Sequence, residues 1–120
     1  MAGDAASVRD KQVIVTRHFD AALRARLRAL VSDELIEAHR ANPPGPHGDA
    51  LERLLNYFRR AAVADKYAIL AVRPFAEYRV VALSGRRGVR PRIVDERNYP
   101  TENAAQHAVF LRRVRDLMEA

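Results

Sequence analysis

The spacing of apolar residues along this chain changes near position 66, and this change constrains the fold more than any other feature. Before it, apolar side chains recur every three or four residues, which is the period of an amphipathic helix. From Tyr67 to Val94 they alternate or form short runs, as in β-strands. The helical period returns after Thr101. The pattern therefore predicts an α+β protein.

Two helices are expected before the change. A stripe at helical spacing predicts a single helix from about His18 to Arg40; its members are Phe19, Leu23, Leu27, Leu30, Val31 and Leu35. The run Asn42–Pro46 ends this helix, because proline supplies no N–H and restricts the residue before it. A second helix is expected from Asp49 to about Ala62, with Asp49 and Glu52 as a capping box. The two helices would form an αα-hairpin.

Three strands and a last helix are expected after the change. Residues 67–72 are apolar on both faces, as in a covered central strand, and residues 78–83 form a second strand. Residues 92–94, which follow a proline, suit an edge strand. The last helix runs from an N-cap at Thr101 to about Met118, with an apolar face made of His107, Phe110, Leu111, Val114, Leu117 and Met118. The predicted fold is an αα-hairpin followed by a small three-stranded antiparallel sheet covered by a C-terminal helix.

Length and composition set the broad class of the protein. A chain of 120 residues suits one domain, which we expect at 13–120, after a flexible N-terminal arm at 1–12. The hydrophobic content of 48% is close to the globular average and predicts a packed core. There is no cysteine, no apolar run near the roughly 20 residues of a membrane span, and no signal-peptide pattern in residues 1–10. A cytoplasmic location is therefore expected.

The chemistry-bearing residues do not form a complete active site in the sequence. No histidine pair has metal-ligand spacing, although His39 and His47 flank the proline-rich loop and could meet in space. His107 lies on an apolar helix face, where it is expected to hydrogen-bond to a backbone group. Asp33 and Glu37 are helical neighbours, and we expect a solvated face rather than an acid–base pair. No catalytic residue, metal ligand or cofactor site is therefore predicted.

The distribution of arginine is the one unusual feature. The net charge is +6, and nineteen of the 21 basic residues are arginine. Within 14 residues that contain no acid lie Arg79, Arg86, Arg87, Arg90 and Arg92. A basic hairpin surface can bind nucleic acid, whereas arginine also suits ion pairs with an acidic protein partner. A GC-rich genome would equally produce an Arg- and Ala-rich chain.

Short segments in the last two thirds of the chain carry a family resemblance. The strongest is the run His107–Arg113 (HAVFLRR), and the others agree with it in order and approximate spacing: Ala41-Asn42-Pro43, Asn56-Tyr57-Phe58-Arg59, Lys66-Tyr67, Asp95-Glu96-Arg97 and Thr101-Glu102. From about Ala38 onward, the chain resembles the small (alpha) subunit of bacterial N,N-dimethylformamidase. The stretch before His18 departs from the family.

The resemblance implies a specific division of labour. In this family a small and a large subunit together form the amidohydrolase, as a hetero-oligomer. The large subunit holds a mononuclear iron with tyrosine and glutamate ligands and hydrolyses dimethylformamide to dimethylamine and formate. The small subunit supplies no iron ligand and packs on the large one, which predicts a non-catalytic accessory role here.

The residues expected to contact the large subunit are aromatic or arginine, the types that dominate interface energetics. They are Tyr57, Phe58 and Arg59, with Arg112 and Arg113 as ion-pair donors. The alternative function is a small basic nucleic-acid-binding protein that uses the surface from Arg79 to Arg92. An independent enzyme is the third possibility.

Overall fold

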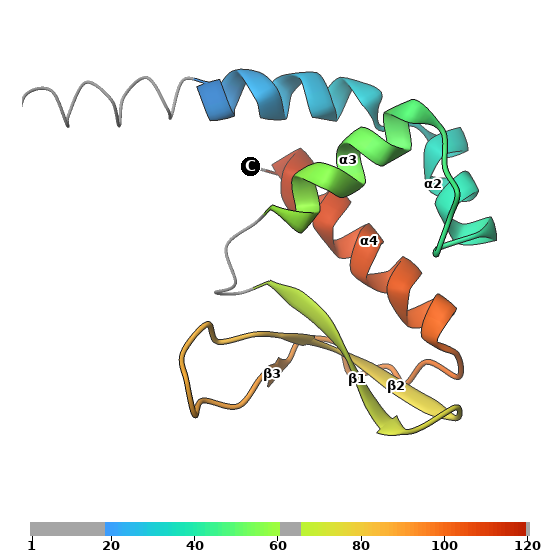
Figure 1. The fold of residues 1–120 in the computed structure, drawn as a ribbon, viewed down its shortest axis with the longest axis vertical. Coiled ribbons are helices and arrows are strands. Elements are labelled where there is room, and N and C mark those ends of the chain that lie inside the picture. Colours follow the sequence, from blue (N-terminus) through green and yellow to red (C-terminus); the bar gives the residue numbers. More distant parts are fainter. Residues whose placement is uncertain (1–18, 61–65, 120) are drawn as a thin grey trace, which may run out of the picture. The chain divides into compact units, whose positions relative to one another are not determined.

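The computed structural model describes residues 19–60 and 66–119, in two compact units that divide after Leu30 (Figure 1). The predicted arm at 1–12 lies outside the described residues, and the single domain predicted from residue 13 stays a prediction. Within the described residues, no helix is long and apolar enough to cross a membrane. The first unit contributes a helix at residues 19–30, and the second unit, residues 31–120, contains all the other elements.

The single helix predicted from His18 to Arg40 is wrong, because the helix ends at Leu30 and a new one, α2, spans Asp33–Ala41. Ser32 caps α2: its backbone is extended (φ −144°, ψ 162°) and its hydroxyl accepts a hydrogen bond from the Leu35 N–H at 3.1 Å. The apolar stripe continues across residues 31 and 32, so periodicity alone does not reveal that the helix is interrupted there. The Ser32 cap sets the start of α2.

Helix α3 spans Asp49–Arg59 and follows α2 through the proline-rich loop, as predicted. It buries the predicted face, made of Leu51, Leu54, Leu55 and Phe58. The capping box is wrong: Gly48 is the N-cap and supplies no side-chain bond, and Asp49 instead pairs with Arg53 at 3.1 Å. The helix also ends before Ala62, because the Arg60 N–H already turns back to the Tyr57 carbonyl at 3.2 Å.

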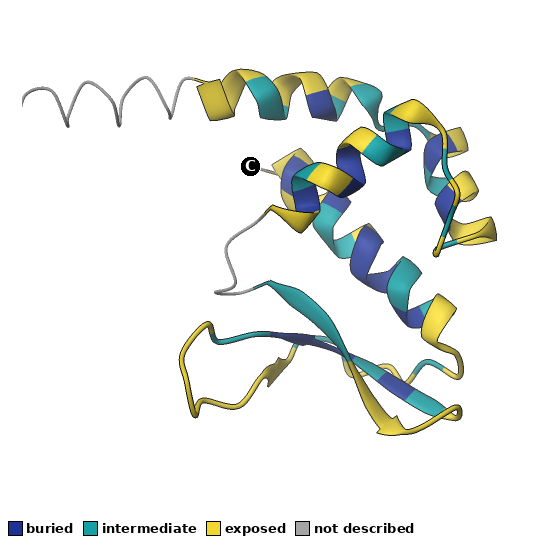
Figure 2. Cartoon of the chain, viewed as in Figure 1, coloured by how far each residue is buried: buried dark blue, intermediate teal, exposed yellow. Residues whose placement is uncertain are grey.

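The sheet contains β1 (Tyr67–Arg73), β2 (Glu77–Ala82) and β3 (Arg92–Ile93), antiparallel and in that order. The central strand is therefore β2, not β1 as predicted. Val80 and Val81 of β2 are buried on opposite faces, whereas Leu70 and Val72 of β1 remain 44% and 45% exposed (Figure 2). The prediction failed because a continuous apolar run such as that of β1 is typical of a strand that is buried on both faces. The edge position predicted for β3 is confirmed.

Helix α4 (Glu102–Glu119) lies across one face of the sheet and also contacts α2 (Figure 1). Thr101 caps it as predicted, its hydroxyl accepting from the Ala104 N–H at 3.1 Å. Ala108 and Val109 pack on Val80, so small side chains make the closest approach to the sheet. Of the predicted apolar face, Phe110, Val114 and Leu117 are buried, whereas Leu111 and Met118 are exposed.

Candidate functional site

A pocket of about 350 Å³ opens in the second unit, between the proline-rich loop, α3, β1 and α4. Its apolar wall is built from Leu55, Ile69, Val109 and Phe110. Two guanidinium groups, those of Arg59 and Arg113, also line it, and among residues 19–60 and 66–119 no carboxylate does. The pocket therefore combines an apolar wall with concentrated positive charge.

Arg113 is the half-buried cation of this pocket. Its Nη2 donates to the Tyr67 carbonyl at 3.2 Å, which ties α4 to β1. Burial lowers the pKa of Arg113, and the nearby Arg59 guanidinium lowers it further. Arg59 lies at the end of α3, where its Nη1 donates to Asn56 Oδ1 at 3.1 Å. Among the described residues, no carboxylate forms an ion pair with either guanidinium.

A cluster of imidazole rings adjoins the pocket. His39 is 4% exposed, stacks on Phe110 with ring centroids 4.0 Å apart, and has its Nδ1 2.9 Å from His107 Nδ1. One of these nitrogens must donate and the other accept, so the two neutral rings hold opposite tautomers. Burial lowers the pKa of His39 to about 4, and a positive charge on His107 or His47 would lower it further. His39 is therefore uncharged at neutral pH.

The histidine predictions had mixed outcomes. His39 and His47 do meet, with ring centroids 5.6 Å apart, and His47 Nε2 donates to the Pro43 carbonyl at 3.1 Å. The backbone partner predicted for His107 is wrong, because its ring bonds to His39 instead. In residues 19–60 and 66–119, no three His, Cys, Asp or Glu side chains converge as a metal site requires.

The carboxylates of α2 belong to its solvent-facing side. Glu37 forms an exposed ion pair with Arg40, three residues later. The Arg40 hydrogen bond lowers the pKa of Glu37, so this carboxylate is ionised and unsuited to act as a general acid. The predicted solvated face is confirmed.

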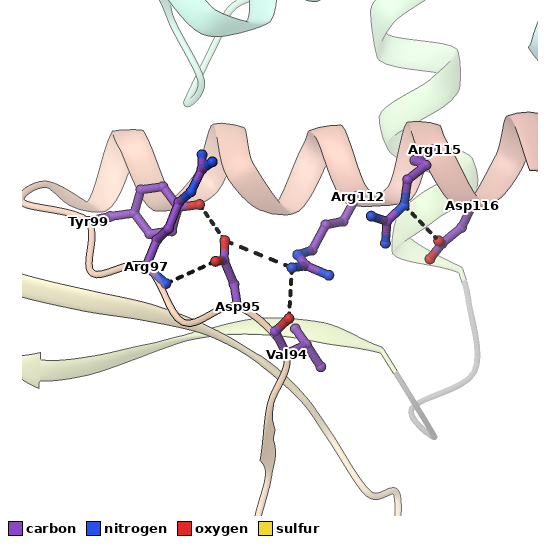
Figure 3. Close-up of polar contacts among 7 residues, drawn as sticks. All are labelled: Val94, Asp95, Arg97, Tyr99, Arg112, Arg115 and Asp116. Carbon is purple, nitrogen blue, oxygen red and sulfur yellow. Dashed lines mark hydrogen bonds and ion pairs between the residues drawn. The ribbon is translucent and has the colours of Figure 1, made fainter.

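A second polar cluster, centred on Asp95, joins the segment after β3 to α4 (Figure 3). Asp95 accepts from the Tyr99 hydroxyl at 2.5 Å and from the Arg97 N–H at 3.0 Å. Arg112 donates to the Val94 carbonyl at 2.7 Å and lies 3.9 Å from Asp95. The Tyr99 bond lowers the pKa of Asp95 and contributes to raising the pKa of Tyr99, after burial. These contacts fasten the sheet to its covering helix.

The structure brings some of the predicted contact residues together and separates others. Arg59 and Arg113 share the pocket, although 53 residues lie between them in the sequence. Phe58 is 5% exposed and packs edge-on against Phe110, so it belongs to the core. Arg112 bonds inside the chain. Arg59 of α3 and Arg113 of α4 are therefore neighbours in space. The interface role of all five residues stays a prediction.

The arginine cluster at 79–92 does not act as one group. Arg79 donates to Asn98 Oδ1 at 2.5 Å, whereas the exposed residues Arg86, Arg87 and Arg90 lie on the loop between β2 and β3. Arg86, Arg87 and Arg90 do not line the pocket. The nucleic-acid role of this cluster stays a prediction.

Comparison with known proteins identifies the family. The model of the N,N-dimethylformamidase alpha subunit family matches residues 14–120. The chain belongs to this family. An N,N-dimethylformamidase alpha subunit from an Alcaligenes species is 34% identical over 122 residues, covering 95% of this chain and 89% of that relative. One from Paracoccus aminophilus is 31% identical, covering 95% of this chain and 83% of that relative.

Membership of the N,N-dimethylformamidase alpha subunit family confirms the resemblance predicted from the sequence. The match also begins well before Ala38, where the resemblance was expected to start. The matched residues include the helix at 19–30, the pocket and the Asp95 cluster.

Proposed function

We propose that this chain is the non-catalytic small subunit of an N,N-dimethylformamidase-like amide hydrolase. It packs on and stabilises a large subunit that binds iron and hydrolyses dimethylformamide to dimethylamine and formate. The observation that carries the proposal is the family match over residues 14–120. Both relatives are named alpha subunits, a name for one of several different chains in an enzyme.

The donor groups described in this chain do not fit an iron site, so the proposal assigns the iron to the large subunit. Metal ligands must be deprotonated. The Tyr67 and Tyr99 hydroxyls instead donate to Asp116 and Asp95, both at 2.5 Å, and burial raises the pKa of each phenol. Carboxylates and imidazoles do not converge in threes among residues 19–60 and 66–119.

The proposed small subunit acts by contact rather than by chemistry. Tyr57, Arg59 and Arg113 are the predicted contact residues with side chains at the surface or at the pocket. Phe58 and Arg112 support the same contact from inside, since one packs in the core and the other ties α4 to the sheet. Binding to a folded partner stabilises both chains by mass action, because neither unfolded chain forms the contact.

Co-purification tests this function. The large formamidase subunit of the same source, carrying an affinity tag, is co-expressed with this chain without a tag. The proposal expects both chains in one peak on size-exclusion chromatography and a higher unfolding temperature for the large subunit in that peak. A large subunit that elutes alone, with an unchanged unfolding temperature, would contradict the proposal.

A further inference from the structure

We propose that the pocket between α3, β1 and α4 is a carboxylate-binding site, in which the guanidinium groups of Arg59 and Arg113 hold the anion. The proposal rests on the positive charge of the pocket, on the guanidinium N–H groups that have no partner among the described residues, and on the apolar wall. It depends on the proposed function only if the carboxylate belongs to the large subunit.

Among the residues that the structure describes, the pocket lining holds two arginines and no acid, and the neutral His39 adds no charge at neutral pH. The exposed Arg59 lies close enough to the half-buried Arg113 to lower its pKa. A second positive charge beside a partly desolvated guanidinium costs stability unless an anion lies between the two. A negatively charged ligand would therefore relieve a repulsion that exists in the unliganded chain.

Within the part of the chain that the structure describes, most N–H groups of both guanidiniums have no hydrogen-bond partner. A guanidinium carries five N–H donors. The hydrogen bonds of Arg113 and Arg59 each use one nitrogen, toward Tyr67 O and Asn56 Oδ1. The planar fork that remains matches the two oxygens of a carboxylate and forms short, charge-assisted bonds with it.

The apolar wall selects the rest of the ligand. Leu55, Ile69 and Val109 line the pocket beside the arginines, and its volume of about 350 Å³ is that of a small-molecule site. Such a wall can pack against the aliphatic part of an organic anion. Inorganic phosphate has oxygens on every side, and those facing the apolar wall would have no hydrogen-bond partner. The chemical class is therefore an aliphatic carboxylate.

An aliphatic carboxylate can come from two sources. One is a free organic acid, and the other is an Asp, Glu or C-terminal carboxylate of the large subunit. Both would use the same two arginines. The two arms of the experiment separate them.

The first arm uses the full chain alone, with propionate as the probe. Arginine Nε–Hε signals are followed by NMR during titration at constant ionic strength. We expect saturable shifts at Arg59 and Arg113, lost in Arg113→Gln and in Arg59→Gln and kept in Arg115→Gln. Arg115 is the matched control, since it lies on the same helix and its ion pair with Asp116 is exposed. The described hydrogen bond of the Arg59 side chain goes to Asn56 on the same helix, so Arg59→Gln keeps the test valid if Arg113→Gln unfolds.

The second arm measures the affinity of the large subunit for the same variants. Arg113→Gln and Arg59→Gln should each raise the Kd about tenfold or more, because a carboxylate left without its partner remains desolvated. Arg115→Gln should leave the Kd unchanged. Propionate binding assigns the site to free acids. A higher Kd for the large subunit without propionate binding assigns the site to a carboxylate of the large subunit.

Two results overturn the carboxylate site. One is an unchanged Kd for the large subunit in both variants together with no NMR shift on adding propionate. The other is an NMR shift with phosphate as large as that with propionate. If the wild-type chain does not bind the large subunit at all, the proposed function fails. The first arm then still decides the pocket, because propionate binding supports the site and its absence overturns it.

Discussion

At the scale of single residues, His39 shows how burial sets a protonation state. Its ring stacks on Phe110, and its polar partner is a second imidazole, that of His107. A proton on His39 would place a positive charge in this buried, apolar contact. The folded state therefore excludes the proton.

This exclusion predicts a pH-dependent stability. The pKa of His39 falls from the ordinary 6.5 to about 4 on folding, so between these values the unfolded chain binds more protons. The stabilising contribution is fully present above pH 6.5 and is lost as the pH falls toward 4. The expected loss is on the order of 3 kcal/mol. Urea unfolding at pH 7 and pH 4.5 measures it.

His39→Gln is the test variant for this prediction, because an amide can still hydrogen-bond to His107 but does not titrate. We expect a clearly smaller loss of stability between pH 7 and pH 4.5 than in the wild-type chain. An unchanged slope would show that His39 does not carry the effect.

Asp95 is the second residue on which the fold depends. Its side chain is 15% exposed and accepts from the Tyr99 hydroxyl and the Arg97 N–H. Asp95→Ala should lower the free energy of unfolding by about 1–3 kcal/mol, because it leaves these donors without an acceptor. Chemical denaturation measures the change. Glu96→Ala, at the exposed neighbouring acid, is the control and should stay within about 0.5 kcal/mol of the wild type.

At the scale of elements, a single cap divides what periodicity presents as one helix. Ser32 begins α2, and Asp33 and Glu34 in its first turn favour the positive end of the helix dipole. Ser32→Ala should therefore destabilise the chain by about 1 kcal/mol, whereas Ser32→Thr retains most of the cap. Equal unfolding free energies for the Ala variant and the wild type would contradict the role of the cap.

The elements predicted from local pattern are mostly those that the structure contains. The antiparallel three-stranded sheet, the Thr101 cap and the buried face of α3 all follow from spacing and residue type. The position of β1 at the edge does not, because an apolar run does not reveal which strand is covered on both faces. The shared pocket of Arg59 and Arg113 escaped prediction for a related reason, since tertiary packing alone joins α3 to α4.

At the scale of the whole molecule, the net charge of +6 predicts weak binding to duplex DNA. The exposed loop residues Arg86, Arg87 and Arg90 can each contact a phosphate, which gives a slope of log K against log salt of about −3. Fluorescence anisotropy at 50 and 200 mM salt measures it. Tight, sequence-discriminating binding at the higher salt would favour the nucleic-acid function over the accessory subunit.

The proposed function requires that this chain serves an amide hydrolase without catalysing the reaction itself. The most direct measurement is dimethylamine release from dimethylformamide by this chain alone, by the large subunit alone and by the co-purified complex. We expect hydrolysis by the complex and none by this chain, whether or not iron is supplied. Iron-dependent release of dimethylamine by this chain alone would contradict the proposed function.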